Sequence, residues 1–198
     1  MKRTDLDRTS RQVRSAPTSF SARSDDEGPV IEGYFAVFNS DYEIWPGATE
    51  QVAPDAFNNC LSLDVRALCD HMTNLVLGRT SAGTLELRVD EKGLWGKIKI
   101  NEQDSDAMNL YARVQRGDVS QCSIGFDIVE ESYIVSPDGQ TCTWTILKVI
   151  LYEVSVVTFP AYEATSVEAR DGSSAESLNE IRFERRKKEL LERIKTLC

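Results

Sequence analysis

Residues 145–159 read TILKVILYEVSVVTF, and nearly all of these positions are apolar or β-branched. A run that is apolar on both faces is typical of a strand buried inside a sheet. Residues 119–128 read VSQCSIGFDI, in which alternate positions are apolar, so this stretch is predicted to pack one face inward. The Ser-Pro-Asp-Gly sequence at 136–139 favours a turn. The sequence therefore predicts two long strands, over 119–130 and 141–159, joined through that turn.

The rest of the core sequence predicts more strands than helices. Residues 30–38 are rich in aromatic and branched side chains, and residues 84–100 alternate on both sides of a turn at 90–93, which predicts a strand and a hairpin. A helical period between Asp104 and Gly117 predicts one helix with an acidic start and a glycine stop. Pro54 begins a short helix that is predicted to reach Leu61. Many strands with few helices favour a mostly β (α+β) fold built on a barrel-like sheet.

Length and charge limit the organisation and the partners. A chain of 198 residues is long enough for one domain with flanking segments. Residues 1–29 have no apolar period and are predicted to be a disordered arm, residues 30–170 to be the domain, and residues 171–198 to be a charged helix. Each end carries a net +1 within a total of −9, so the domain carries −11 and is expected to repel nucleic acid.

Other function classes are disfavoured by what the sequence lacks. No stretch approaches the roughly 20 apolar residues of a membrane helix, and the first 29 residues have no apolar secretory segment, so we expect a cytosolic protein without a membrane partner. The five cysteines form no Cys-x-x-Cys pair, and a single histidine cannot complete a usual zinc site. We therefore expect free thiols, no metal and no cofactor.

Three residues supply the parts of a Ser–His–acid triad. His71 is the only histidine, so any reaction that needs an imidazole must use it, and its place in the alternating pattern of residues 65–71 predicts a strand position on the apolar side. Ser123 lies on the face of its strand opposite the apolar one, and Gly125 beside it leaves room for another backbone. Glu153 lies in the middle of a buried strand and needs a partner such as an imidazolium.

Each of these residues also has a structural interpretation. A histidine in an apolar pattern is often a core residue, a serine beside a glycine is usually structural, and a mid-strand glutamate often pairs with Lys or Arg. Cys122 is a rival nucleophile, but alternation places it in the core, where a thiol is usually inert. The triad hypothesis assigns attack to Ser123, proton transfer to His71, and orientation of the imidazole to Glu153.

The chain resembles the prohead maturation proteases of tailed phages with HK97-like capsids. The resemblance covers about residues 30–170 and is carried by the segments GYFAVFN (33–39), PDAF (54–57), DH (70–71), LGRTSAGTL (77–85), RGDV (116–119), SIGF (123–126), EVSVVT (153–158), PAY (160–162) and Arg170. It implies a serine endopeptidase with a β barrel surrounded by helices, as in the related herpesvirus assembly proteases. By motif, His71 and Ser123 match the family's histidine and nucleophile. Glu153 matches the position where the herpesvirus relatives place a second histidine.

The resemblance also implies a place and a set of partners. Such an enzyme works in the host cytoplasm inside the procapsid, cuts the scaffold segment from the major capsid protein, and cleaves itself. A homodimer, as in the herpesvirus relatives, and autocleaved or docking ends are further expectations. The alternative is a catalytically inactive scaffold or capsid-assembly module with the same fold, favoured by the acidic domain, the charged tail and Met72, where the family usually has Asp.

Overall fold

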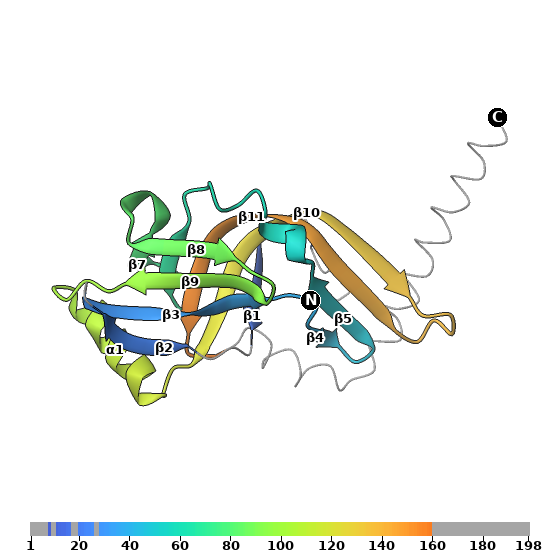
Figure 1. Ribbon diagram of the computed structural model, residues 1–198. Coiled ribbons are helices and arrows are strands. Elements are labelled where there is room, and N and C mark those ends of the chain that lie inside the picture. Colours follow the sequence, from blue (N-terminus) through green and yellow to red (C-terminus); the bar gives the residue numbers. More distant parts are fainter. Residues whose placement is uncertain (1–7, 9–10, 17–19, 26–27, 160–198) are drawn as a thin grey trace.

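In a computed structural model, which describes residue 8 and residues 11–16, 20–25 and 28–159, the chain forms two β-sheets, one α-helix and two short 3-10 turns (Figure 1). The larger sheet has the order β1-β10-β11-β5-β4, and β6 pairs with both β11 and β7. Its strands are β1 (Gln12–Ala16), β4 (Tyr42–Trp45), β5 (Ala48–Val52), β6 (Arg66–Cys69), β7 (Met72–Arg79), β10 (Gln121–Val135) and β11 (Cys142–Val157). The smaller sheet has the order β2-β3-β9-β8, from β2 (Ser21–Asp25), β3 (Gly28–Val37), β8 (Leu85–Val89) and β9 (Gly93–Lys99).

The hairpin of β10 and β11 is the frame of the larger sheet. The two strands pair antiparallel from Gln121 opposite Val157 to Val135 opposite Cys142. The other edge of β11 pairs in parallel first with β5 and then with β6. Because β11 has neighbours on both edges and buried side chains on both faces near its end, its nearly continuous apolar sequence is explained. The two predicted long strands and the turn between them are confirmed.

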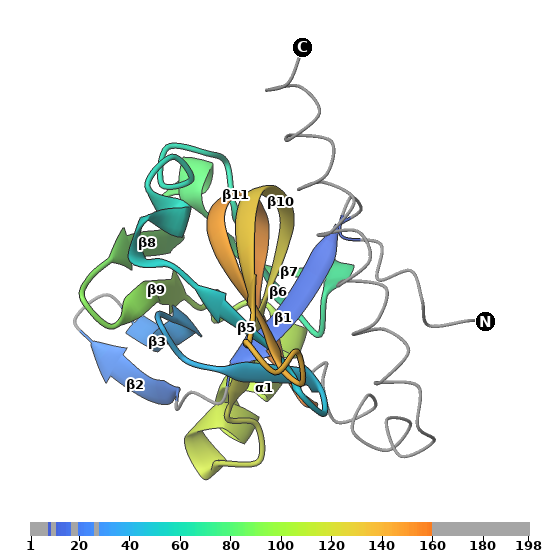
Figure 2. The same ribbon diagram turned by 90° about the vertical axis from the view of Figure 1, so that its right-hand side faces the viewer.

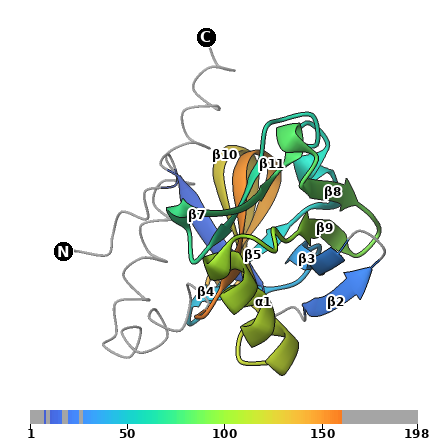
Figure 3. The same cartoon turned by 90° about the vertical axis from the view of Figure 1, so that its left-hand side faces the viewer.

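The helix and the second hairpin also follow the sequence closely. Helix α1 (Ser105–Arg116) begins after Asp104, whose carboxylate accepts the backbone N–H groups of Asp106 and Ala107. It ends at Gly117, which has φ 88°, a left-handed conformation that favours glycine. Strands β8 and β9 pair on either side of the predicted turn. Helix α1 contacts β2, β3 and β7 (Figure 3).

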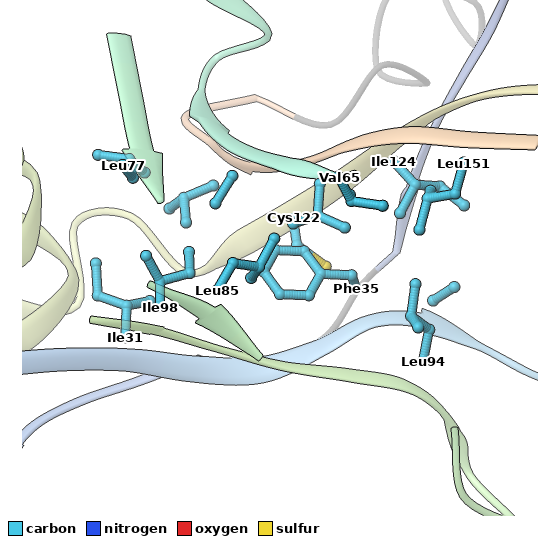
Figure 4. Packing of buried hydrophobic residues seen from close by; sticks show 14 of the residues in the cluster. Ile31, Phe35, Val65, Leu77, Leu85, Leu94, Ile98, Cys122, Ile124 and Leu151 are labelled. Carbon is cyan, nitrogen blue, oxygen red and sulfur yellow. The ribbon is translucent and has the colours of Figure 1, made fainter. Parts of the chain in front are cut away.

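The larger of the two hydrophobic clusters in the described residues lies between the two sheets. Side chains from β3, β8 and β9 meet those from β10 and β11, with α1 and residues around β6 and β7 closing the side. Figure 4 shows Phe35 packed among Leu85, Val65 and Cys122. The inward face of β10 contributes Cys122, Ile124 and Phe126 to this core, as alternation predicted. Ser123 therefore lies on the opposite face of the sheet.

The structure differs from several expectations. Part of the segment predicted to be disordered forms strands: β1 pairs with β10, and β2 pairs with β3. Both β1 and β2 are edge strands. An edge strand needs only backbone hydrogen bonds and one packed face, so it can form from a sequence with weak apolar patterning. The short helix η1 (Pro54–Phe57) is a 3-10 turn that ends before Leu61. A further 3-10 turn, η2 (Thr80–Ala82), was not expected.

The predominantly β fold is confirmed, but the described strands form two open sheets rather than one closed barrel, and one α-helix accompanies them instead of a surrounding set. The predicted C-terminal helix lies outside the described residues. Among the residues that the structure describes, none of the helices combines the length and apolar character that crossing a membrane requires.

Candidate active site

His71 lies in the tight turn between β6 and β7, not on a strand as its alternating pattern predicted. Cys69 pairs with Met72, which leaves Asp70 and His71 as the two central residues of the hairpin turn. Their φ angles are 48° and 60°, so both lie in the left-handed region that a two-residue turn of this twist requires. The sequence pattern was misleading because a hairpin this tight is read easily as one continuous strand.

Asp70 anchors this turn to the end of β11. Its carboxylate accepts the backbone N–H of Thr158 at 2.7 Å and the Thr158 hydroxyl at 3.0 Å. The Asp70 backbone N–H donates to the carbonyl of Val156 at 3.0 Å. Asp is also among the few residues that tolerate a positive φ. Asp70 is therefore a positioning residue for His71, a role that sequence reasoning did not assign to it.

The imidazole of His71 meets the carboxylate of Glu153. His71 Nδ1 lies 2.6 Å from Glu153 Oε1, and the side chain of Glu153 is 9% exposed. The hydroxyl of Ser155 donates to the second oxygen, Oε2, at 2.7 Å and accepts the His71 backbone N–H at 3.3 Å. Both oxygens of the buried carboxylate thus have partners. With Nδ1 facing a carboxylate, Nε2 is the nitrogen that remains to take up or deliver a proton.

Gly125 makes room for that carboxylate. Gly125 lies opposite Glu153 in the β10–β11 pairing. A Cβ atom at position 125 would lie 2.2 Å from Glu153 Oε1, which is far inside any real contact distance. The sequence predicted that this glycine admits another backbone, whereas the structure fills the space with the side chain of Glu153.

Ser123 lies beside this pair on the same face of the sheet. It is directly opposite Ser155 on the neighbouring strand, and directly opposite residues of an antiparallel pair share a face. Ser123 is fully buried, and its hydroxyl donates to the backbone carbonyl of Arg14 at 3.0 Å. Arg14 belongs to β1, which runs antiparallel to β10 and places Ser15 opposite Ser123 (Figure 2). The hydroxyl therefore points to the chain's own N-terminal strand.

The rival nucleophile is placed in a different environment. Cys122 is fully buried in the core, and its thiol donates to the backbone carbonyl of Tyr34 at 2.9 Å. The four cysteines of the described residues are free thiols, as predicted. Within the described part of the chain, no group of three or more His, Cys, Asp or Glu side chains is arranged to hold a metal ion.

Sequence reasoning gave no role to Ser155 or to Asp70. A signal for Ser155 was available, because a residue two positions from Glu153 on a strand lies on the same face. No local signal identified the contacts of Asp70, since Thr158 is 88 residues away.

Comparison with known proteins shows the family to which the chain belongs. The sequence model of the caudovirus prohead serine protease family matches residues 18–180. The prohead protease of Enterobacteria phage HK97 is 33% identical over 161 residues, which cover 77% of this chain and 64% of that protein. The chain thus spans slightly less than two thirds of the length of this relative. No solved structure matches the chain. Because the family model covers most of the sequence, the chain belongs to the caudovirus prohead serine protease family.

Proposed function

We propose that the protein is a prohead maturation serine endopeptidase that uses Ser123, His71 and Glu153. The observation that carries this proposal is the 2.6 Å contact between His71 Nδ1 and Glu153 Oε1, beside Ser123 on the same face of the sheet. In this mechanism Ser123 attacks a peptide carbonyl, and His71 Nε2 takes its proton and then delivers it to the leaving amine. Glu153 holds the imidazole in the required tautomer and offsets its positive charge.

The substrate and the location are part of the same proposal. Family membership and the HK97 relative support cleavage of the scaffold segment of the major capsid protein, together with self-cleavage, inside the procapsid in the host cytoplasm. The proposal also includes a fold related to that of the herpesvirus assembly proteases, with their β barrel and their homodimer. The open sheets of the described residues do not by themselves support the barrel.

Substitution of the nucleophile tests the proposal. Ser123→Ala removes the attacking oxygen while the buried site keeps nearly the same volume, so we expect cleavage of the cognate capsid precursor to fall by at least about 10³-fold. His71→Ala should have a comparable effect. Gel electrophoresis and mass spectrometry of the precursor measure both losses, and circular dichroism checks the fold. Equal cleavage by wild type and Ser123→Ala would refute the assignment.

The second candidate is a non-catalytic scaffold or capsid-assembly module, favoured by the complete burial of Ser123 and by its hydrogen bond to Arg14. A serine-directed phosphonate separates the two functions, because it labels only a nucleophilic hydroxyl next to a working base. Covalent labelling at Ser123, located by peptide mapping, excludes the inactive module. A chain that is never labelled, even at excess reagent and long times, excludes the protease.

A further inference from the structure

We infer that β1 occupies the substrate-binding edge of β10 as the chain's own substrate, that Arg14–Ser15 is the bond presented for cleavage, and that Glu50 selects a basic residue before that bond. The inference rests on the proposed function, since it requires Ser123 to be the nucleophile. It adds the cleavage position and the residue that reads the substrate.

β1 lies where an extended peptide substrate could pair with β10. Without β1, strand β10 would be the edge of the larger sheet, with a row of backbone groups open to pairing. An extended peptide can add to such an edge as another strand. β1 does so from Gln12 opposite Phe126 to Ala16 opposite Cys122 (Figures 1 and 2). The five residues of β1 thus lie along the segment of β10 that carries Ser123.

A backbone carbonyl group of β1 lies next to the proposed nucleophile. The Ser123 hydroxyl lies 3.0 Å from the carbonyl oxygen of Arg14, so the carbonyl group that adjoins the proposed nucleophile is that of Arg14. In the state described here the hydroxyl donates to that oxygen. Attack requires β1 to shift so that the carbonyl carbon, instead of its oxygen, faces Ser123 Oγ, and requires the hydroxyl proton to turn from that oxygen to His71 Nε2.

The side chain of Arg14 is paired with a buried carboxylate. Glu50 on β5 is fully buried, and its Oε1 lies 2.5 Å from Arg14 Nε and its Oε2 3.2 Å from Arg14 Nη2. Arg8 also reaches Glu50, at 2.9 Å. A buried carboxylate is costly without cationic partners. A substrate that replaces β1 along β10 would therefore be favoured if it supplied an arginine or lysine at the position of Arg14.

The reaction at this bond needs no reagent other than water. Ser123 Oγ bonds to the carbonyl carbon of Arg14, and its proton passes to His71 Nε2. The bond from that carbon to the Ser15 nitrogen breaks, and the nitrogen takes the proton from His71. Water then hydrolyses the Arg14 ester, which frees Ser123 and leaves a carboxylate on Arg14. Release of residues 1–14 would open the edge of β10 to other substrates.

The test follows release of residues 1–14 from the purified full chain by mass spectrometry. We expect a new N-terminus at Ser15 in wild type and none in Ser123→Ala. Because β1 pairs with β10 of the same chain, the first-order rate constant of release should not change with protein concentration. A first-order rate constant that rises with protein concentration, or an Arg14–Ser15 bond that stays intact while the capsid precursor is cut, would overturn the inference.

Variants of the ion pair test the role of Glu50. Arg14→Ala and Glu50→Gln should each slow the release of residues 1–14 by roughly 10- to 100-fold, as expected for loss of a charge-assisted hydrogen bond. Arg14→Lys should restore most of the rate. The double variant should be little slower than either single one, because both changes remove the same contact. Arg23→Ala, which removes an exposed arginine paired with Glu32 on the other sheet, is the matched control and should stay within about twofold of wild type.

The outcomes separate this inference from the proposed function. If wild type cuts neither itself nor the capsid precursor, the proposed protease function fails. If wild type cuts the precursor through Ser123 while Arg14→Ala and Glu50→Gln release residues 1–14 as fast as wild type, only the inference about Glu50 and Arg14 fails. Thermal unfolding of each variant shows whether a lost rate reflects a lost fold.

Discussion

The carboxylate of Glu153 takes up the space that any side chain at position 125 would need. Glu153 Oε1 is also the atom that contacts His71 Nδ1. The absence of a side chain at Gly125 is therefore as important for the site as the charged groups. Sequence inspection found the glycine but assigned the space to another backbone. The contact across the strands shows that it serves the acid of the proposed triad.

Gly125→Ala should therefore inactivate the enzyme with little loss of fold. A Cβ atom at 2.2 Å from Oε1 and 2.9 Å from the carboxyl carbon forces the Glu153 side chain away from His71. We expect kcat for the capsid precursor to fall by roughly 10²-fold or more, with thermal unfolding changed by only a few degrees. Gly83→Ala is a control for adding a methyl group elsewhere, because nothing lies within 4 Å of a Cβ atom there. Wild-type activity of Gly125→Ala would contradict the assigned role of Glu153.

The hairpin of β6 and β7 sets the position of the only histidine. Asp70 in its turn forms hydrogen bonds with Val156 in β11 and with Thr158 just after β11. The β6 strand pairs in parallel with β11 at Glu153–Val156, so the same strand carries the acid and anchors the turn. The relative position of His71 and Glu153 therefore depends on this packing of one hairpin against one strand.

Asp70→Ala should weaken the turn and the catalysis that depends on it. Alanine loses the hydrogen bonds to Thr158 and is strained at φ 48°, so we expect a destabilisation of about 1–3 kcal/mol and a fall in kcat of about tenfold. Asp70→Asn keeps an acceptor oxygen and tolerates the positive φ, so it should retain most of the stability and most of kcat. Chemical denaturation measures the stability, and precursor cleavage measures kcat. Equal behaviour of the two variants would show that the anchoring contacts do not matter.

The core of the molecule encloses several thiols. One of them is that of Cys122, which the alternative cysteine mechanism would need to expose. Cys122 and Cys142 are both almost completely buried, and burial raises the pKa of Cys142 to about 11. Burial likewise raises the pKa of Cys60. A raised thiol pKa means that less thiolate, the reactive form, is present at a given pH, and at pH 8 roughly one Cys142 thiol in a thousand is ionised.

Native protein treated with iodoacetamide at pH 8 should therefore keep its activity. Mass spectrometry should find Cys122 and Cys142 unmodified before unfolding and modified after unfolding in denaturant. Reactivity of Cys142 should increase as pH rises toward its pKa, since the thiolate fraction increases. Loss of cleavage that tracks alkylation of Cys122 would instead support a cysteine hydrolase, and Ser123→Ala would then remain active.

Local sequence signals were sufficient for the elements that depend on nearby residues. Helix α1 follows from the cap at Asp104, its apolar stripe and the stop at Gly117, and the β8–β9 hairpin follows from alternation around a turn. The types of residue that the chemistry needs were also evident, because the chain has one histidine and one carboxylate in its most apolar strand. These features are determined within a few positions along the chain.

Contacts between distant segments determined the rest. The partner of Glu153, the anchoring of His71 through Asp70, and the strand that β1 adds over Ser123 all join residues from 82 to 109 positions apart. Alternation states which face a side chain occupies but not which strand lies beside it. Sheet pairing, register and the edge of β10 that β1 covers are properties of the folded chain, because backbone hydrogen bonds between strands are nearly independent of the side chains that they join.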